Sequence, residues 1–516
     1  MFGLLRHRCL PKSAGGLFAS RAPLQYRALQ AQAQVSKREG DISDAFASLS
    51  GQEFTPLTPE YAELKTRLIQ GREDLIRQSW ERLLKDLREE IPLIVEQGSK
   101  IIPQIDFKDV DDAPEAFSQE LRKRGVAVIR GVVSQQEALG WKEDLRQYIR
   151  QNPQTKAFPP ENPQVFELYW SRAQLLARAH PNMLKAQRFL MSYWHSSNPE
   201  TPISTRHPIS YCDRLRMRLP GDARFALGPH VDGGSVERWD ERGYGLGKVY
   251  DNVWKGEWEQ FDPWEASCRL PVESDLHQGV GACTAFRMFQ GWLSLSQTGP
   301  FEGTLLVNPL LAKATAYYLL RPFFSPKRGI DSPGAQTASE AITESASFLD
   351  ADNWELDARQ SSWIQGATPG RGQELSHLLH PHLHLAKSMI HMPTVQPGDY
   401  VAWHCDTIHA VDRIHKGAAD SSVLYIPACP LTEDNAKYLA TQRSMFVQGT
   451  PSPDFGGGVG ESAHVGRVGA REMVELVQVE GARAMGLAEW DSAEEGLSGA
   501  EREVLDRANK VLRFYD

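Results

Sequence analysis

The spacing of apolar and polar positions changes along the chain, and the first strongly patterned segment covers residues 57–98. Its apolar positions recur every three or four residues, at Leu64, Leu68, Leu75, Ile76, Trp80, Leu83, Leu84 and Leu87. This spacing places them on one face of a helix, with charged residues on the other faces. Because Gly71 interrupts the pattern, the segment predicts a packing helix or a helix pair that breaks near Gly71.

The next patterned segment predicts a helix, a strand and a second helix. Residues 113–123 have amphipathic helical spacing, whereas residues 125–133 form a short apolar, β-branched run of the kind found in buried strands. Ser134 stands in position to cap the helix that follows, and Glu137 comes three residues later, as in a capping box. Helical spacing returns through residues 160–200.

A period of two, which is typical of strands, begins near residue 210. The segment 211–219 alternates basic with apolar residues, Arg214, Arg216 and Arg218 against Leu215, Met217 and Leu219. Further strands are expected at residues 286–295, 303–308, 388–394, 399–404, 408–414 and 421–428. A helical and Ser/Ala-rich stretch interrupts them over residues 310–376, and helical patterns return after Pro430. The sequence therefore predicts a core of strands between two helical regions.

Composition and charge exclude several classes of protein. Of the 516 residues, 41% are hydrophobic and 24% charged, the proportions of a globular protein rather than a disordered or fibrous one. No apolar run approaches the ~18–20 residues of a membrane helix. The net charge of −9 argues against a nucleic-acid binder held by bulk positive charge. The six cysteines form no Cys-x-x-Cys pair, which argues against a disulfide framework or zinc finger and fits a reducing compartment.

Basic residues gather at the N-terminus. Residues 1–38 hold seven Lys and Arg residues and no acid, and the first acidic residue is Glu39. An Arg-rich, acid-free start with interspersed Ser, Ala and Leu is typical of a mitochondrial transit peptide, and no apolar stretch indicates a secretory signal instead. We therefore expect residues 1–38 to direct the chain to mitochondria and residues 39–56 to be a linker. A disordered basic tail is the alternative.

Two short segments carry residues that bind metals. The first, residues 228–234, contains His230 and Asp232, which point to the same side of an extended chain. The second, residues 397–409, begins with Pro-Gly-Asp, continues as an aromatic strand and contains His404 and His409. Two imidazoles and one carboxylate leave three positions of a metal open, which suits non-haem Fe(II). A hydrogen-bonded surface turn is the alternative interpretation of an isolated His-x-Asp.

Four stretches together resemble the Fe(II)/2-oxoglutarate-dependent oxygenase superfamily, in the branch similar to phytanoyl-CoA hydroxylase. They are residues 125–133 with the helix after them, 228–232, 291–309 and 398–409. Residues 60–480 as a whole resemble an uncharacterised bacterial and fungal family known only as a domain of unknown function. The resemblance implies an α+β fold with a double-stranded β-helix, or jelly roll, surrounded by helices.

The resemblance also implies a division of the chain. We expect a helical N-terminal region with the first buried strand at residues 57–200, and a jelly-roll oxygenase core at residues 201–430. A helical insertion is expected within that core at residues 310–387, and a C-terminal helical region at residues 431–516.

The same resemblance implies a ligand set. In the superfamily motif a His often ends one strand and the metal ligand follows five residues later, which implies that His230, Asp232 and His409 bind Fe(II). His404 is the alternative to His409. The implied cosubstrate is 2-oxoglutarate, and the implied substrate is a small molecule.

The residue that would hold the distal carboxylate of 2-oxoglutarate is less evident. In the superfamily it is a cation on the next strand, but residues 421–428 contain no Arg or Lys. We expect Arg413 or Arg287 to take this role, because the planar guanidinium pairs with a carboxylate through two hydrogen bonds. Arg214, Arg216 and the hydroxyl groups of Ser421, Ser422 and Tyr425 are further alternatives.

A His-rich stretch competes as a metal site. His377, His380, His382, His384 and His391 lie within fifteen residues. Three of them, His380, His382 and His384, would share one face of a strand and could bind a metal. We favour the interpretation that these histidines are polar groups at the edge of the insertion.

The sequence as a whole predicts a non-haem iron oxygenase that hydroxylates a small molecule, without nucleic-acid binding or membrane insertion. A cupin-like metalloenzyme that does not use 2-oxoglutarate is one alternative, and the missing basic residue in residues 421–428 favours it. A non-catalytic jelly-roll binding protein is another, and the complete ligand set argues against it.

Overall fold

The helical segment near the N-terminus folds as two helices, α1 (Glu60–Ile69) and α2 (Glu73–Gln97), in the computed structural model. Gly71 lies between them with φ 75°, in the left-handed region, so the chain breaks where the sequence predicts. The structure describes residues 45–49, 54–223, 226–280, 282–327 and 345–514. The basic leader expected at residues 1–38 and part of the linker lie outside these residues.

Eight strands form the larger sheet, in the order β1-β2-β14-β8-β16-β6-β4-β3. They are β1 (Gln104–Asp106), β2 (Val126–Arg130), β3 (Ala157–Phe158), β4 (Val165–Phe166), β6 (Leu215–Arg218), β8 (Phe289–Ser294), β14 (Tyr400–His404) and β16 (Ser421–Tyr425). The β1–β2 pair is parallel and the other pairs are antiparallel. Five segments that are far apart in the sequence and predicted as strands thus join in one sheet.

Five strands form the smaller sheet, in the order β12-β7-β15-β9-β13. They are β7 (His230–Val231), β9 (Leu305–Val307), β12 (Gln373–Glu374), β13 (Ile390–His391) and β15 (His409–Val411), and all pairs are antiparallel. Two further strand pairs lie outside these sheets, β10 (Phe324–Pro326) with β11 (Trp354–Leu356) and β5 (Ser204–Ile209) with β17 (Cys429–Leu431).

Alternate residues of the larger sheet pack on its two sides, as the period of two requires. Val128 of β2 belongs to the same hydrophobic core as Val231 of the smaller sheet. The next residue, Ile129, belongs to a second core with Leu145 and Leu190, which lie on helices. One face of the larger sheet is therefore turned toward the smaller sheet, and the other is covered by helices.

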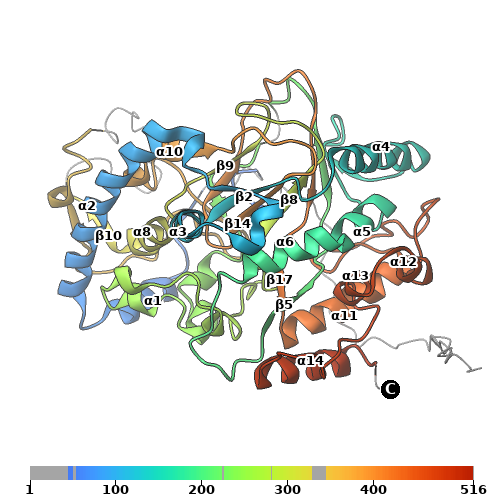
Figure 1. Cartoon of the computed structure of the whole chain (residues 1–516). Coiled ribbons are helices and arrows are strands. Elements are labelled where there is room, and N and C mark those ends of the chain that lie inside the picture. Colours follow the sequence, from blue (N-terminus) through green and yellow to red (C-terminus); the bar gives the residue numbers. More distant parts are fainter. Residues whose placement is uncertain (1–44, 50–53, 224–225, 281, 328–344, 515–516) are drawn as a thin grey trace, which may run out of the picture. The chain divides into compact units, whose positions relative to one another are not determined.

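The helices cover the sheets from several sides (Figure 1). They are α3 (Glu115–Arg124), α4 (Gln135–Gln151), α5 (Arg172–Ala179), α6 (Pro181–Met191), α7 (Asp251–Trp254), α8 (Leu311–Leu320), α10 (Leu385–Ser388), α11 (Glu433–Gln448), α12 (Ala470–Leu476), α13 (Val479–Ala484) and α14 (Gly499–Val511). Ser134 caps α4 by accepting a hydrogen bond from the Glu137 amide at 3.2 Å, and Ser498 with Glu501 forms a capping box at α14. The described part of the chain is thus a mixed α+β structure with several sheets.

None of the described helices combines the length and the apolar character that crossing a bilayer requires. The region expected as a helical insertion, residues 310–387, contains α8 but also contributes strands. One of them, β12, pairs with β7 and extends the smaller sheet beside His230.

Candidate metal centre

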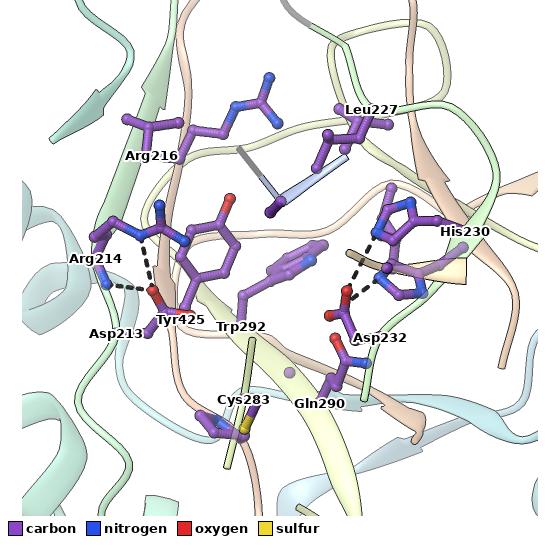
Figure 2. Close-up of a pocket in the computed structure, with 18 of the residues that line it drawn as sticks. Asp213, Arg214, Arg216, Leu227, His230, Asp232, Cys283, Gln290, Trp292 and Tyr425 are labelled. Carbon is purple, nitrogen blue, oxygen red and sulfur yellow. Dashed lines mark hydrogen bonds and ion pairs between the residues drawn. The ribbon is translucent and has the colours of Figure 1, made fainter. Parts of the chain in front are cut away.

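Three of the predicted ligands converge at the start of two paired strands. His230 begins β7 and His409 begins β15, and the antiparallel register sets them opposite each other with ring centroids 4.1 Å apart. Asp232 follows β7, with Oδ1 3.7 Å from Nε2 of His230 and Oδ2 3.8 Å from Nε2 of His409. Figure 2 shows His230 next to this carboxylate.

The separations fit a shared ion. Two ligand atoms that each lie about 2.1 Å from one metal are at most about 4.2 Å apart. The two distances from the imidazole nitrogens to Asp232, 3.7 and 3.8 Å, are within that limit. One candidate ligand atom from each of the three residues lies within 4.8 Å of the others. A divalent ion would need only a small closure of the three side chains.

Backbone carbonyl groups orient the two imidazoles. Nδ1 of His230 lies 2.7 Å from the Gly228 oxygen, and Nδ1 of His409 lies 3.0 Å from the Thr407 oxygen. A neutral imidazole that donates its Nδ1–H to a carbonyl keeps the lone pair on Nε2, which is the atom that faces Asp232. Burial, with the nearby charge of His230, lowers the pKa of His409 to about 3. His409 is therefore neutral at physiological pH, as a metal ligand must be.

The carboxylate is held in its ionised form. Burial by itself would raise the pKa of Asp232, but electrostatic interactions with His409, His230 and Arg287 outweigh it and lower the pKa. Nη2 of Arg287 lies 3.8 Å from Oδ2 of Asp232. Two imidazoles and one carboxylate make a donor set that suits a divalent transition metal with open positions.

The alternative ligand, His404, is held elsewhere in the core. Its Nε2 donates to the Pro263 oxygen at 2.9 Å, and its Nδ1 accepts from the Asp406 amide at 3.0 Å. Its ring stacks on Trp194 with centroids 4.6 Å apart, and burial lowers its pKa to about 3. Because both ring nitrogens are used, His404 has no lone pair to offer a metal. The structure thus brings His409, and not His404, to His230.

A second cluster, His404, Cys405 and Asp406, also has ligand atoms within 4.8 Å. Its carboxylate already makes two buried ion pairs, at 3.0 Å with Arg238 and at 2.5 Å with Arg269. Since the positive charges next to Asp406 come from the protein, this cluster is an internal ion-pair network.

The three converging side chains line a cavity between the two sheets. The larger sheet contributes Arg216, Arg218, Gln290, Trp292, Trp403, Ser421, Val423 and Tyr425, and the smaller sheet contributes His230, Leu305, His409 and Val411. The cavity encloses about 1500 Å³ of space free of protein atoms, including solvent at its mouth. The three side chains therefore face open space in which a small molecule can approach them.

The sequence and the fold both match known proteins. The model of the family described as Gig2-like matches residues 55–487. The chain belongs to the Gig2-like family. A curated relative, the uncharacterized protein YbiU of Escherichia coli (strain K12), is 31% identical over 380 residues, which are 71% of this chain and 82% of that protein.

Two solved structures show the same fold as this Gig2-like chain. GlcNAc Inducible Gene 2, GIG2, of Candida albicans is 29% identical, with a TM-score of 0.77 and coverage of 90% of this chain and 97% of that one. A protein of Salmonella typhimurium LT2 described as a proposed oxidoreductase is 28% identical, with a TM-score of 0.70 and coverage of 84% and 99%. The expected resemblance to a family with bacterial and fungal members is confirmed.

The structure separates the two arginines expected to bind a cosubstrate. Arg287 lines the cavity beside Asp232. Arg413 is exposed and lies outside the cavity lining, and its backbone carbonyl accepts a hydrogen bond from Arg218 at 3.1 Å. Its position four residues after His409 does not bring it to the site, because the chain turns outward after β15.

Sequence reasoning gave too little weight to the basic face of β6. Arg216 is 5% exposed, lines the cavity and pairs through its backbone with Val423 of β16. Burial raises the pKa of Tyr425, and the charge and hydrogen bond of Arg216 offset part of that rise. The alternation of charged and apolar residues was visible in the sequence. A charged strand face, however, normally predicts contact with solvent rather than with a cavity.

A residue from the linker region also escaped sequence reasoning. Phe46 packs edge-on against His230, with ring centroids 4.7 Å apart. The Ala47 amide donates to Glu374 at 2.8 Å, and Arg371 donates to the Phe46 carbonyl at 2.9 Å. This short segment therefore covers one imidazole of the centre, and no motif in the sequence indicated it.

The His-rich stretch does not form the predicted strand face. Residues Pro381–Leu383 form a 3₁₀ turn, and His380 and His382 are buried. The Nδ1 atom of His382 lies 3.0 Å from the Tyr317 hydroxyl, and burial lowers the pKa of His380 to about 3. These histidines pack as neutral rings among aromatic side chains, so the expectation of polar groups at an edge does not hold for them.

Proposed function

We propose that this chain is a non-haem Fe(II)- and 2-oxoglutarate-dependent oxygenase that hydroxylates a small molecule. The observation that carries the proposal is the convergence of His230, Asp232 and His409 at a cavity between two sheets. Such a set occupies one face of the metal and leaves room for a bidentate cosubstrate and dioxygen. The relative of Salmonella typhimurium LT2 described as a proposed oxidoreductase supports the redox class.

The order of the strands supports a double-stranded β-helix, as in the branch similar to phytanoyl-CoA hydroxylase. The chain passes through β6, β7, β8, β9, β13, β14, β15 and β16 in sequence. Of these, β6, β16, β8 and β14 are neighbours in the larger sheet, and β7, β15, β9 and β13 are neighbours in the smaller one. The eight strands alternate between the two sheets except at β9 and β13, which pair with each other in the smaller sheet, and this order fits a jelly roll.

Each side chain has a distinct task in this proposal. His230 and His409 would bind the metal through Nε2 and Asp232 through its carboxylate, with the Gly228 and Thr407 carbonyls fixing the imidazole orientation. Fe(II) bound there would couple the oxidation of 2-oxoglutarate by dioxygen to the oxidation of a substrate C–H bond. The protein contributes position and the exclusion of water.

We assign the distal carboxylate of 2-oxoglutarate to Arg216. In the resembled superfamily the cation stands on the strand that corresponds to β16, and Arg216 is paired with Val423 of that strand. Its side chain lines the cavity, where Figure 2 shows the guanidinium extending beyond Tyr425. Arg216, on the strand next to β16, thus supplies a guanidinium to the part of the cavity where β16 itself has no basic residue. The exposed position of Arg413 does not support the same role.

Anaerobic titration tests the proposal. Fe(II) followed by 2-oxoglutarate should produce the charge-transfer absorption of a chelated 2-oxo acid, and air with a substrate library should then release succinate. Because β16 contains no Arg or Lys, a metalloenzyme that does not use 2-oxoglutarate is a second candidate function. Iron binding without any 2-oxoglutarate absorption would favour that candidate. The absence of iron binding would contradict both.

We further propose that residues 1–38 direct the chain to mitochondria. The support is their seven basic residues and the absence of any acid before Glu39.

A further inference from the structure

A second cavity meets the first at the carboxylate of the candidate metal centre. It encloses about 720 Å³ and shares Asp232, Gly233, Cys283, Arg287 and Gln290 with the larger cavity. Its lining also includes exposed residues, Thr284 and Asp434 among them, so it opens at the surface. A molecule that enters by this route arrives beside Asp232.

Arg287 is placed at this junction with its hydrogen-bonding capacity unused. Its side chain is 12% exposed, its Nη2 lies 3.8 Å from Asp232, and its guanidinium lies over the Tyr211 ring at 5.3 Å. It donates no hydrogen bond to any residue that the structure describes, although a guanidinium carries five N–H donors. Arg218, by contrast, donates to Asp222 and to the Asp412 carbonyl, at 2.8 and 2.5 Å.

Gln290 offers a second unused group at the same junction. It lies on β8, is 5% exposed, and lines both cavities. Within the described part of the chain its side-chain amide makes no hydrogen bond. Because Gln290 lines both cavities, a ligand in them can complete the hydrogen bonds of this amide. Figure 2 places Gln290 next to Asp232.

We propose that Arg287 and Gln290 bind a carboxylate of the primary substrate at the junction of the two cavities. This inference rests on the proposed function of the metal centre and adds the chemical class of its substrate. The planar guanidinium can accept a carboxylate through two parallel hydrogen bonds, and the Gln290 amide supplies a further donor. A metal bound to Asp232 would take up the negative charge that now faces Arg287, which leaves the guanidinium charge for an incoming anion.

We assign 2-oxoglutarate and the substrate carboxylate to different cavities. Arg216 lines only the larger cavity, whereas Arg287 and Gln290 line both. The cosubstrate therefore lies toward Arg216, between the sheets, and the substrate enters through the second cavity and is held beside the metal.

The test compares acids with their uncharged analogues. The probes are C3–C6 2-hydroxy and 2-amino carboxylic acids, each paired with its primary amide, added anaerobically to protein loaded with Fe(II) and 2-oxoglutarate. The readouts are the change in the charge-transfer absorption and, in air, the stimulation of succinate release. We expect some acids to change both and their amides to change neither.

Three variants locate the effect. Arg287→Met should weaken binding of an active acid by about 10- to 150-fold, the loss expected for hydrogen bonds to a charged partner, while 2-oxoglutarate affinity changes less than about threefold. Arg413→Met removes the same charge from an exposed site outside the cavity and should leave both affinities unchanged. Gln290→Glu places a negative charge at the junction and should weaken binding of the acids.

Three results would overturn the inference. They are equal effects of acids and amides, no effect of any acid on protein that loads Fe(II) and 2-oxoglutarate normally, and an equal loss of 2-oxoglutarate and acid affinity in Arg287→Met. Failure of the wild-type protein to bind 2-oxoglutarate would instead contradict the proposed function. In that case, stabilisation of the Co(II)-loaded protein against heat by the acids, absent in Arg287→Met, would still support a carboxylate site.

Discussion

The buried ion-pair network behind the metal centre gives a prediction whose magnitude follows from the structure. Asp406 accepts hydrogen bonds from Arg238 at 3.0 Å, Tyr250 at 3.1 Å and Arg269 at 2.5 Å, and its side chain is 1% exposed. Asp406→Asn keeps the shape but removes the charge that balances two buried guanidinium groups. Removing one partner of a buried ion pair lowers the free energy of unfolding by about 3–5 kcal/mol.

An exposed ion pair supplies the matched control. Arg77 pairs with Asp74 on the surface of α2, where the two side chains are 51% and 87% exposed. The same chemical change there, Asp74→Asn, should cost no more than about 1 kcal/mol. We therefore expect the free energy of unfolding in urea to fall by at least about 2 kcal/mol more in Asp406→Asn than in Asp74→Asn.

The network should also act on the metal centre. Arg238 donates to the backbone carbonyl of Asp232 at 2.5 Å, and Asp406 is three residues before His409. Loss of the Asp406 charge frees Arg238 to move, so Fe(II) affinity should fall together with stability. Outer groups that orient metal ligands typically change affinity by about 10- to 100-fold. Equal urea midpoints for the two variants, or an unchanged Fe(II) affinity in Asp406→Asn, would refute this reasoning.

Three further predictions test other parts of the structure. Arg216→Met should weaken 2-oxoglutarate binding by about 10- to 150-fold in an anaerobic titration, because it removes hydrogen bonds to a charged group, whereas Arg413→Met should not. Burial raises the pKa of Glu461 to about 7, so the folded state binds a proton that the unfolded state has lost, and stability should fall by up to about 3 kcal/mol as pH rises from 4.5 to 7. Glu461→Gln should remove that slope in urea unfolding, and an unchanged slope would exclude this carboxyl as its source. A fusion of residues 1–40 to a reporter should enter mitochondria, and its retention in the cytosol would contradict the targeting proposal.

Local signals in the sequence predicted the framework well. The apolar run of β2 and the cap at Ser134 depend on neighbouring residues alone, and both form as expected. The motif around His230 and Asp232 is also local. Only the pairing of β7 with β15 brings His409 to it, and that long-range register was anticipated through the family resemblance rather than through periodicity.

Features that depend on what lies opposite a strand could not be predicted in the same way. The charged face of β6 suggested solvent, yet Arg216 is buried because that face lines a cavity. The histidines near His382 suggested a polar edge, yet their neutral rings pack beside Trp354 and Tyr317. Arg413 was expected to bind the cosubstrate because it follows His409 closely in the sequence. The distance along the sequence does not indicate in which direction the chain leaves β15.

Anaerobic Fe(II) titration of the wild-type protein, His409→Ala and His404→Ala tests the central claim most directly. His409→Ala removes one of the three proposed ligands, whereas His404 uses both ring nitrogens within the core, at 2.9 Å from Pro263 and 3.0 Å from the Asp406 amide. The account predicts one equivalent of Fe(II) bound by the wild-type protein, a steep loss of affinity in His409→Ala with the fold retained, and a much smaller change in His404→Ala. An affinity that survives His409→Ala, or that is lost only in His404→Ala, would contradict it.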